Sequence, residues 1–175
     1  MVYLALFQLT IEGKMMECST ADLSDKYPDV VRVADPIFKS YGAKTSFSGQ
    51  IETVKVFEDN VLVKEWLSQP GQGKVLVVDG GGSLRCALVG DIIAKSAADN
   101  GWEGVIVYGC IRDSATIATI SIGIKALNTH PLKSIKHGHG SKHIPVSFAG
   151  VTFHPGHYVY SDADGVMVSE KSLSL

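Results

Sequence analysis

Residues 74–83, KVLVVDGGGS, carry the strongest strand signal in this 175-residue chain. The continuous apolar run at 75–78 is typical of a short strand buried on both faces, and the three glycines after it indicate a turn. A helix is expected at 91–100, and a second buried strand follows it at 105–108, VIVY. A strand, a helix and a strand in this order predict a βαβ-like centre and therefore an α/β fold.

The segments on either side extend this centre. Helices are expected at 19–25, where hydroxyl side chains can cap the first turn, at 61–67, and around positions 84, 87 and 88. Partial alternation predicts a strand over 47–57, and short runs rich in Val and Ile predict strands at 122–126, 146–148, 151–153 and 165–168. We expect a single domain over residues 16–175 with a strand-rich C-terminal half. Residues 1–15 are interpreted as an N-terminal extension of uncertain origin, because Met15 and Met16 offer an alternative start.

Composition excludes several classes of protein. The net charge of −2 gives no basic footprint, so no direct nucleic-acid partner is expected. The apolar run at 1–11 is too short to span a membrane and lacks a basic leader, which favours the cytoplasm and no membrane partner. Cys18, Cys86 and Cys110 lack metal-binding spacing and are expected to be reduced thiols, with Cys86 and Cys110 in apolar surroundings.

The strongest functional candidates are Asp91 and, after twenty intervening residues, Arg112 and Asp113. Both acidic positions follow apolar strand-like runs, and functional groups gather at strand ends in α/β proteins. Two carboxylates could hold a hard divalent cation such as Mg²⁺ or Mn²⁺, and arginine could stabilise a developing oxyanion. The structural alternative is that Asp91 begins a helix while Arg112 and Asp113 form a surface turn.

Other motifs favour structural roles. The run Gly80–Gly82 lacks the Lys-Ser/Thr of a nucleotide loop, so a tight turn is favoured, and Arg85 after it is expected at the surface or in a subunit contact. The segment Lys136–His143 is rich in histidine but matches no structural zinc spacing, which favours an exposed loop. His154 and His157 flank a Pro-Gly turn.

Several ordered motifs together resemble a known family. They are residues 47–60, 75–91, 101–113, 149–156 and 161–166, and the likeness covers about residues 16–170. The chain resembles the RraA-like group, named for the regulator of ribonuclease activity A. That group shares its fold with the metal-dependent 4-hydroxy-4-methyl-2-oxoglutarate aldolases. The resemblance implies a swivelling α/β/β sandwich, assembled as homotrimers or hexamers with sites between subunits.

The resemblance is compatible with two different functions. The aldolases carry an Asp, twenty residues and then Arg-Asp, a pattern kept here at Asp91, Arg112 and Asp113, whereas ribonuclease regulators can lack it. The segment 47–60 looks closest to the regulators. The resemblance therefore implies either a divalent-metal-dependent lyase on small 2-oxo acids or a non-catalytic inhibitor of ribonuclease E.

For the lyase, a role can be assigned to each candidate. Asp113 is the expected direct metal ligand, with Mg²⁺ or Mn²⁺ as cofactor, and Asp91 would hold the metal or its waters. Arg112 would stabilise the enolate oxygen, and the backbone amides of Gly90, Asp91 and Ile92 would bind the substrate carboxylate. Oxaloacetate decarboxylation needs only these groups, whereas retro-aldol cleavage also needs a base that no residue clearly supplies.

Overall fold

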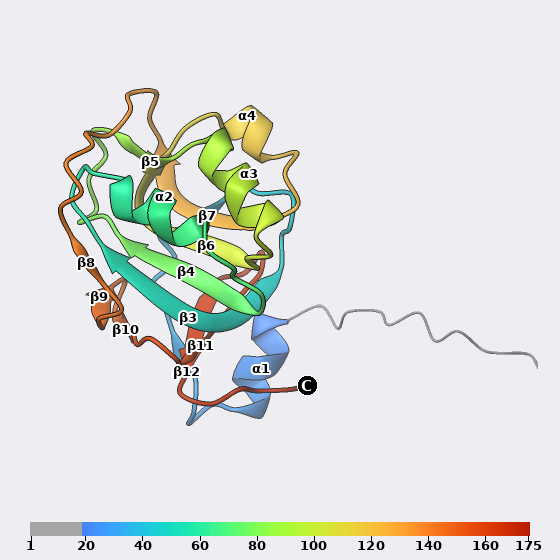
Figure 1. The fold of residues 1–175 in the computed structure, drawn as a ribbon. Coiled ribbons are helices and arrows are strands. Elements are labelled where there is room, and N and C mark those ends of the chain that lie inside the picture. The colour runs from blue at the N-terminus through green and yellow to red at the C-terminus, as the bar shows by residue number, and fades with distance from the viewer. Residues whose placement is uncertain (1–18) are drawn as a thin grey trace, which may run out of the picture.

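A computed structural model describes residues 19–175, which form one large mixed sheet covered on both faces (Figure 1). Its centre is four parallel strands: β3 (Phe47–Lys55), β4 (Lys74–Asp79), β6 (Gly104–Ile111) and β7 (Gly123–Thr129). The strands β11 (Tyr158–Ser161), β12 (Val166–Ser169) and β1 (Arg32–Val33) extend it antiparallel beyond β3, and β2 (Lys39–Ser40) pairs beyond β7. Two short strands, β5 (Ala87–Val89) and β8 (Ser141–Lys142), pair with β6 and β3.

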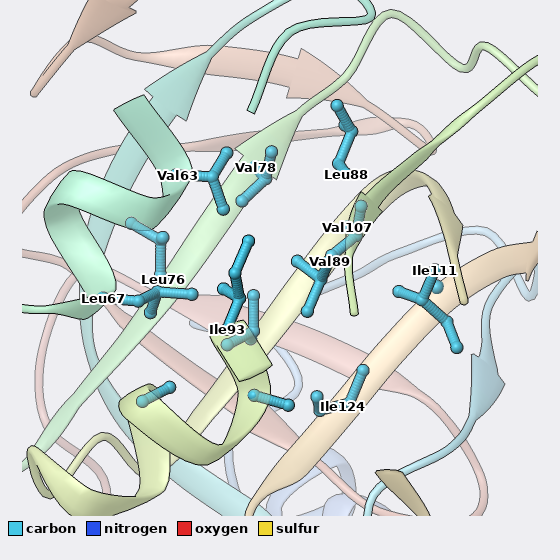
Figure 2. Packing of buried hydrophobic residues seen from close by; sticks show 14 of the residues in the cluster. Val63, Leu67, Leu76, Val78, Leu88, Val89, Ile93, Val107, Ile111 and Ile124 are labelled. Atoms are coloured by element: carbon cyan, nitrogen blue, oxygen red, sulfur yellow. The ribbon is translucent and has the colours of Figure 1, made fainter. Parts of the chain in front are cut away.

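Strand β4 is buried on both faces, as its sequence predicts. Leu76 and Val78 face a cluster formed with the helices α2 (Val61–Leu67) and α3 (Asp91–Asp99), shown in Figure 2. Val75 and Val77 face a second cluster, formed with the hairpin of β9 (Val146–Phe148) and β10 (Val151–Phe153). Helices on one face and a β-hairpin on the other give the expected α/β/β layering.

Two further helices complete the described chain. The short helix α4 (Ser114–Ile117) follows β6 on the helical face. The helix α1 (Thr20–Lys26) is capped by Ser19, whose hydroxyl accepts from the amide of Asp22 at 3.2 Å, and Leu23 packs with Tyr160 and Met167. No helix within residues 19–175 is long and apolar enough to cross a membrane.

The α/β class and the strand-rich C-terminal half are confirmed, and α2 has the expected bounds. The helical segment expected around Leu84, Ala87 and Leu88 is wrong, because residues 87–89 form strand β5, and Ala87 pairs with Cys110 of β6. A short apolar run that is buried throughout has no periodicity to separate strand from helix. The strand β11 and the helix α4 were not predicted, and the proposed boundary at residues 15–16 lies outside the described residues.

The start of the parallel sheet depends on the ring of Phe47. This buried ring covers Gly104 and Gly123, the first residues of β6 and β7, and a Cβ at either position would overlap it. Gly123→Ala should therefore lower the free energy of unfolding by about 1–3 kcal/mol through overpacking. Urea denaturation would measure it, with Gly165→Ala as a control because a Cβ there meets no atom within 4 Å. Equal stability of the two variants would contradict this packing argument.

Candidate active site

Asp91, Arg112 and Asp113 lie together at the carboxyl ends of β5 and β6. The amide of Arg112 donates to the carbonyl of Val89 at 2.9 Å, which fixes the end of β6 beside the turn from β5 into α3. Gly90 fills that turn, and a Cβ there would lie 2.8 Å from Oδ2 of Asp113 and 3.3 Å from Nε of Arg112. A side chain at this position would therefore displace the Asp113 carboxylate from its present place.

The side chains of Arg112 and Asp113 face each other and remain open to solvent. Nε of Arg112 lies 3.5 Å from Oδ2 of Asp113, and their side chains are 41% and 39% exposed. The Asp91 amide donates to the same Oδ2 at 3.4 Å, and the Ile92 amide donates to Oδ1 of Asp91 at 2.8 Å. The first amides of α3 thus already face carboxylates, as expected for an anion-binding helix N-terminus.

Asp113 adopts a left-handed backbone conformation, with φ of 57° and ψ of 36°. This conformation is uncommon outside glycine and is best tolerated by Asn and Asp. Its carbonyl accepts from the amide of Ile117 at 2.9 Å, so the residue also begins α4. The turn directs the carboxylate back toward Gly90 instead of along the helix.

A pocket of about 170 Å³ lies beside Gly90, Asp91 and Arg112. Three lysines also line it: Lys64, Lys133 and Lys136. Cations therefore outnumber the single lining carboxylate, Asp91, which suits a small acid with more than one negative charge. These lysines were not predicted from the sequence. Lys64 lies in α2, and Lys133 and Lys136 follow β7, whose carboxyl end lies beside that of β6.

Lys136 is placed by Asn60, which lies at the start of α2. Nζ of Lys136 donates to Oδ1 of Asn60 at 3.3 Å. The side-chain nitrogen of Asn60, Nδ2, donates to the carbonyl of Leu88 in β5 at 3.1 Å. A single buried side chain therefore joins the pocket lysine to the strand that leads to Gly90.

Asp59 anchors the same region from below the surface. Asp59 is only 1% exposed. Its Oδ2 accepts hydrogen bonds from the backbone amides of His137, Gly138 and His139 at 2.8, 2.8 and 3.2 Å. Oδ1 accepts from the amide of Val61 at 3.0 Å. Burial by itself raises the pKa of Asp59, but the four backbone hydrogen bonds lower it below its usual value.

The glycine run forms the predicted turn. Gly81 and Gly82 have φ of 67° and 70°, and the amides of Gly80 and Gly82 both donate to the carbonyl of Tyr108 at 3.1 Å. Arg85 is exposed and pairs with Glu58 at 2.6 Å, so its expected surface position is confirmed. Its role in a subunit contact stays a prediction.

The histidine-rich segment lies largely at the surface, as expected. The rings of His137 and His139 stack with centroids 5.7 Å apart, and those of His154 and His157 lie 4.7 Å apart at their turn. Within residues 19–175, no three His, Cys, Asp or Glu side chains are grouped to hold a metal.

Two of the cysteines lie within the described residues. Cys86 and Cys110 are buried free thiols, as predicted, and burial raises the pKa of each. Cys18 lies outside the described residues.

The comparison with known families settles the classification. The model "RraA-like: Aldolase/RraA" matches residues 20–168. This chain belongs to the RraA-like family. A relative from Dechloromonas aromatica is 59% identical over 91% of this chain and all of its own length. One from Aromatoleum aromaticum is 60% identical over 90% of this chain and 99% of its own. Both carry the name "Putative 4-hydroxy-4-methyl-2-oxoglutarate aldolase".

Two solved structures share the RraA-like fold in full. The RNA-processing inhibitor RraA from Thermus thermophilus has a TM-score of 0.87 and 43% identity, over 91% of this chain and 96% of its own. A Geobacillus kaustophilus structure titled S-adenosylmethionine:2-dimethylmenaquinone methyltransferase also has a TM-score of 0.87, with 53% identity over 89% of this chain and 96% of its own. Proteins with different named activities therefore share this fold, so function has to be argued from the site.

Proposed function

We propose that this RraA-like chain is a divalent-metal-dependent lyase for small 2-oxo acids, a 4-hydroxy-4-methyl-2-oxoglutarate aldolase that also decarboxylates oxaloacetate. The observation that carries the proposal is the convergence of Asp91, Arg112 and Asp113 around Gly90, next to a small pocket lined by cations. The name shared by relatives that are 54–60% identical supports it.

The carboxylates fit a magnesium or manganese ion that keeps much of its water. Mg²⁺ is commonly held by one or two protein carboxylates, with water and substrate completing its coordination. Asp113 is exposed enough to act as the direct ligand. The backbone amide of Asp91 donates to the Asp113 carboxylate, so the side chain of Asp91 would orient water bound to the ion. A cation held there would supply Lewis acidity to the keto and carboxylate oxygens of the substrate.

Arg112 acts where charge develops in the reaction. When the C3–C4 bond of oxaloacetate breaks, CO₂ leaves and the electron pair passes to the enolate of pyruvate, which then takes a proton at C3. The guanidinium of Arg112 stabilises the enolate oxygen as its charge grows. The amides at the start of α3 bind the C1 carboxylate by releasing the side-chain carboxylates that they now contact.

The pocket lysines bind the far end of the substrate. Oxaloacetate and 4-hydroxy-4-methyl-2-oxoglutarate both carry a carboxylate remote from the 2-oxo group. Lys133 and Lys136 line the pocket alongside Arg112 and supply ammonium groups for that charge. Aldol cleavage further requires removal of the C4 hydroxyl proton, and we assign no described side chain to that step.

Purified protein with Mg²⁺ or Mn²⁺ should release pyruvate from oxaloacetate faster than the metal alone, and EDTA should abolish the excess. Coupling to lactate dehydrogenase measures the release directly. Retro-aldol cleavage of 4-hydroxy-4-methyl-2-oxoglutarate is scored in the same assay, since it also yields pyruvate. Folded, metal-supplied protein with no release above the metal background from either acid would refute the lyase proposal.

Variants at positions 112 and 113 should separate metal binding from charge stabilisation. Asn is the better substitute at position 113 because the backbone there is left-handed. Asp113→Asn should abolish turnover and weaken Mn²⁺ binding together. Arg112→Ala should reduce kcat by about 10² or more while Mn²⁺ binding is largely kept. Manganese affinity is read by electron paramagnetic resonance, and unchanged affinity in Asp113→Asn would overturn the ligand assignment.

A second candidate function is inhibition of ribonuclease E by direct contact. It is favoured by the 43% identity and TM-score of 0.87 to the Thermus RNA-processing inhibitor. This role needs a docking surface and no metal, so Asp113→Asn should leave such binding intact while it abolishes lyase activity. Retained binding in that variant would show that the two activities are separable.

We further propose that the chain assembles as a homotrimer or hexamer, with the site at a subunit boundary. Ile92 lines the pocket and is 75% exposed, and Phe57, Leu132 and Ile135 are exposed on neighbouring segments. Large apolar side chains around a polar site favour a covering subunit. Light scattering should report three or six times the 18.7 kDa chain mass, and a monomer would count against both the assembly and a shared site.

A further inference from the structure

We infer that Asp59 is a positioning residue, whose buried carboxylate holds the loop 136–139 so that Lys136 faces the pocket and selects substrates with a second carboxylate. The inference rests on the proposed lyase function and deepens it, because it concerns which 2-oxo acid the site prefers. Asp59 itself does not line the pocket, so it acts through Lys136.

The contacts of Asp59 are those of a buried anion held by backbone alone. Three consecutive amides, those of residues 137–139, converge on Oδ2, and the positive φ of Gly138, 78°, curls the loop around that oxygen. Within residues 19–175, no lysine, arginine or histidine lies within ion-pair distance of Asp59. The loop amides therefore balance the charge, which ties the loop to an ionised carboxylate specifically.

The anchored loop decides where Lys136 can reach. The residue lies one position before the three bound amides, and its ammonium group meets Asn60, the residue directly after Asp59. The preceding stretch is paired as well, because the amide of Ile135 donates to the carbonyl of Glu58 at 2.9 Å. The side chain of Lys136 is at the surface, so its direction depends on the anchored backbone and on the hydrogen bond to Asn60 and not on packing.

The position of Lys136 would let the site distinguish acids that carry a second carboxylate from acids that do not. Oxaloacetate carries a distal carboxylate for Lys136, whereas pyruvate, its product, has none. Weakened placement of Lys136 should therefore raise the KM for oxaloacetate and leave inhibition by pyruvate unchanged. The groups that meet the developing charge, Arg112 and Asp113, stay in place, so kcat should change little.

Asp59→Asn is the direct test, because it keeps the shape but turns an acceptor oxygen into an N–H donor that faces other donors. We expect the KM for oxaloacetate to rise about tenfold or more, as for a lost hydrogen bond to a charged group. The kcat value and the pyruvate inhibition constant should stay within about twofold. In a Lys136→Ala background Asp59→Asn should raise the KM for oxaloacetate no further, because both substitutions act through the same contact of Lys136 with the substrate.

Asp162→Asn provides a matched control. Asp162 also accepts backbone amides, from Thr20, Asp164 and Gly165, and its pKa is likewise lowered: those hydrogen bonds and the Thr20 hydroxyl outweigh the opposing effect of burial. Asp162 directly follows β11, and the last residue of β11, Ser161, pairs with the first residue of β3, Phe47. Asp162 therefore lies at the amino ends of the parallel strands, whereas the pocket lies at their carboxyl ends. This variant should lose stability and keep the wild-type KM.

If Asp59→Asn does not fold, Gly138→Ala tests the same anchor from the loop side. A Cβ at position 138 lies 3.7 Å from Val61, so the substitution strains the positive φ without a clash. A wild-type KM in a folded anchor variant, or an equal rise in the pyruvate inhibition constant, would overturn the role of Asp59 while leaving the lyase proposal standing. A wild-type protein that releases no pyruvate would remove the lyase proposal and this inference together.

Discussion

The parallel register of β3, β4 and β6 is the constraint on which the site depends. Lys55, Asp79 and Tyr108 are paired across the three strands, so their carboxyl ends meet at one edge of the sheet. The segments leaving that edge carry Asp59, Gly90 and Arg112, which come from distant parts of the sequence. Leu76 and Val78 pack against the helices and Val75 and Val77 against the hairpin, so β4 is held between both layers. A slip by one residue would misalign the strands and separate the functional groups.

Local signals were enough to predict the part of this arrangement that lies along single elements. The run at 75–78 indicates a strand buried on both faces, and apolar spacing over 61–67 gives the bounds of α2. Asp91 and Arg112–Asp113 could be paired from sequence because both lie downstream of apolar strand-like runs. In the structure the backbone amide of Asp91 contacts the carboxylate of Asp113. Strand β5 was misjudged because three buried residues beside β6 carry no periodic signal.

The remainder of the site is built from contacts that no local pattern records. Asp59 binds amides nearly eighty positions later in the chain, and Lys136 meets Asn60 across a similar separation. The histidines and glycines at 137–140 read as a surface loop, and their side chains do lie largely at the surface. The contacts that hold this loop run through its backbone, which the buried carboxylate of Asp59 organises. Side-chain type alone could not reveal this, because any residue except proline supplies an amide.

The distribution of charge around the pocket suits the proposed combination of a divalent cation with several basic residues. Asp91 and Asp113 would repel a substrate carboxylate placed against them, and a divalent ion would turn that repulsion into attraction. Arg112 sits beside this acidic end, but as an exposed pair with Asp113 it gains little stability from that contact and remains free to turn to substrate. Lys133 and Lys136 then provide a second positive region for a remote carboxylate. The proposed dicarboxylic 2-oxo acids would match this order of charges from one end to the other, whereas a purely inhibitory surface has no need of it.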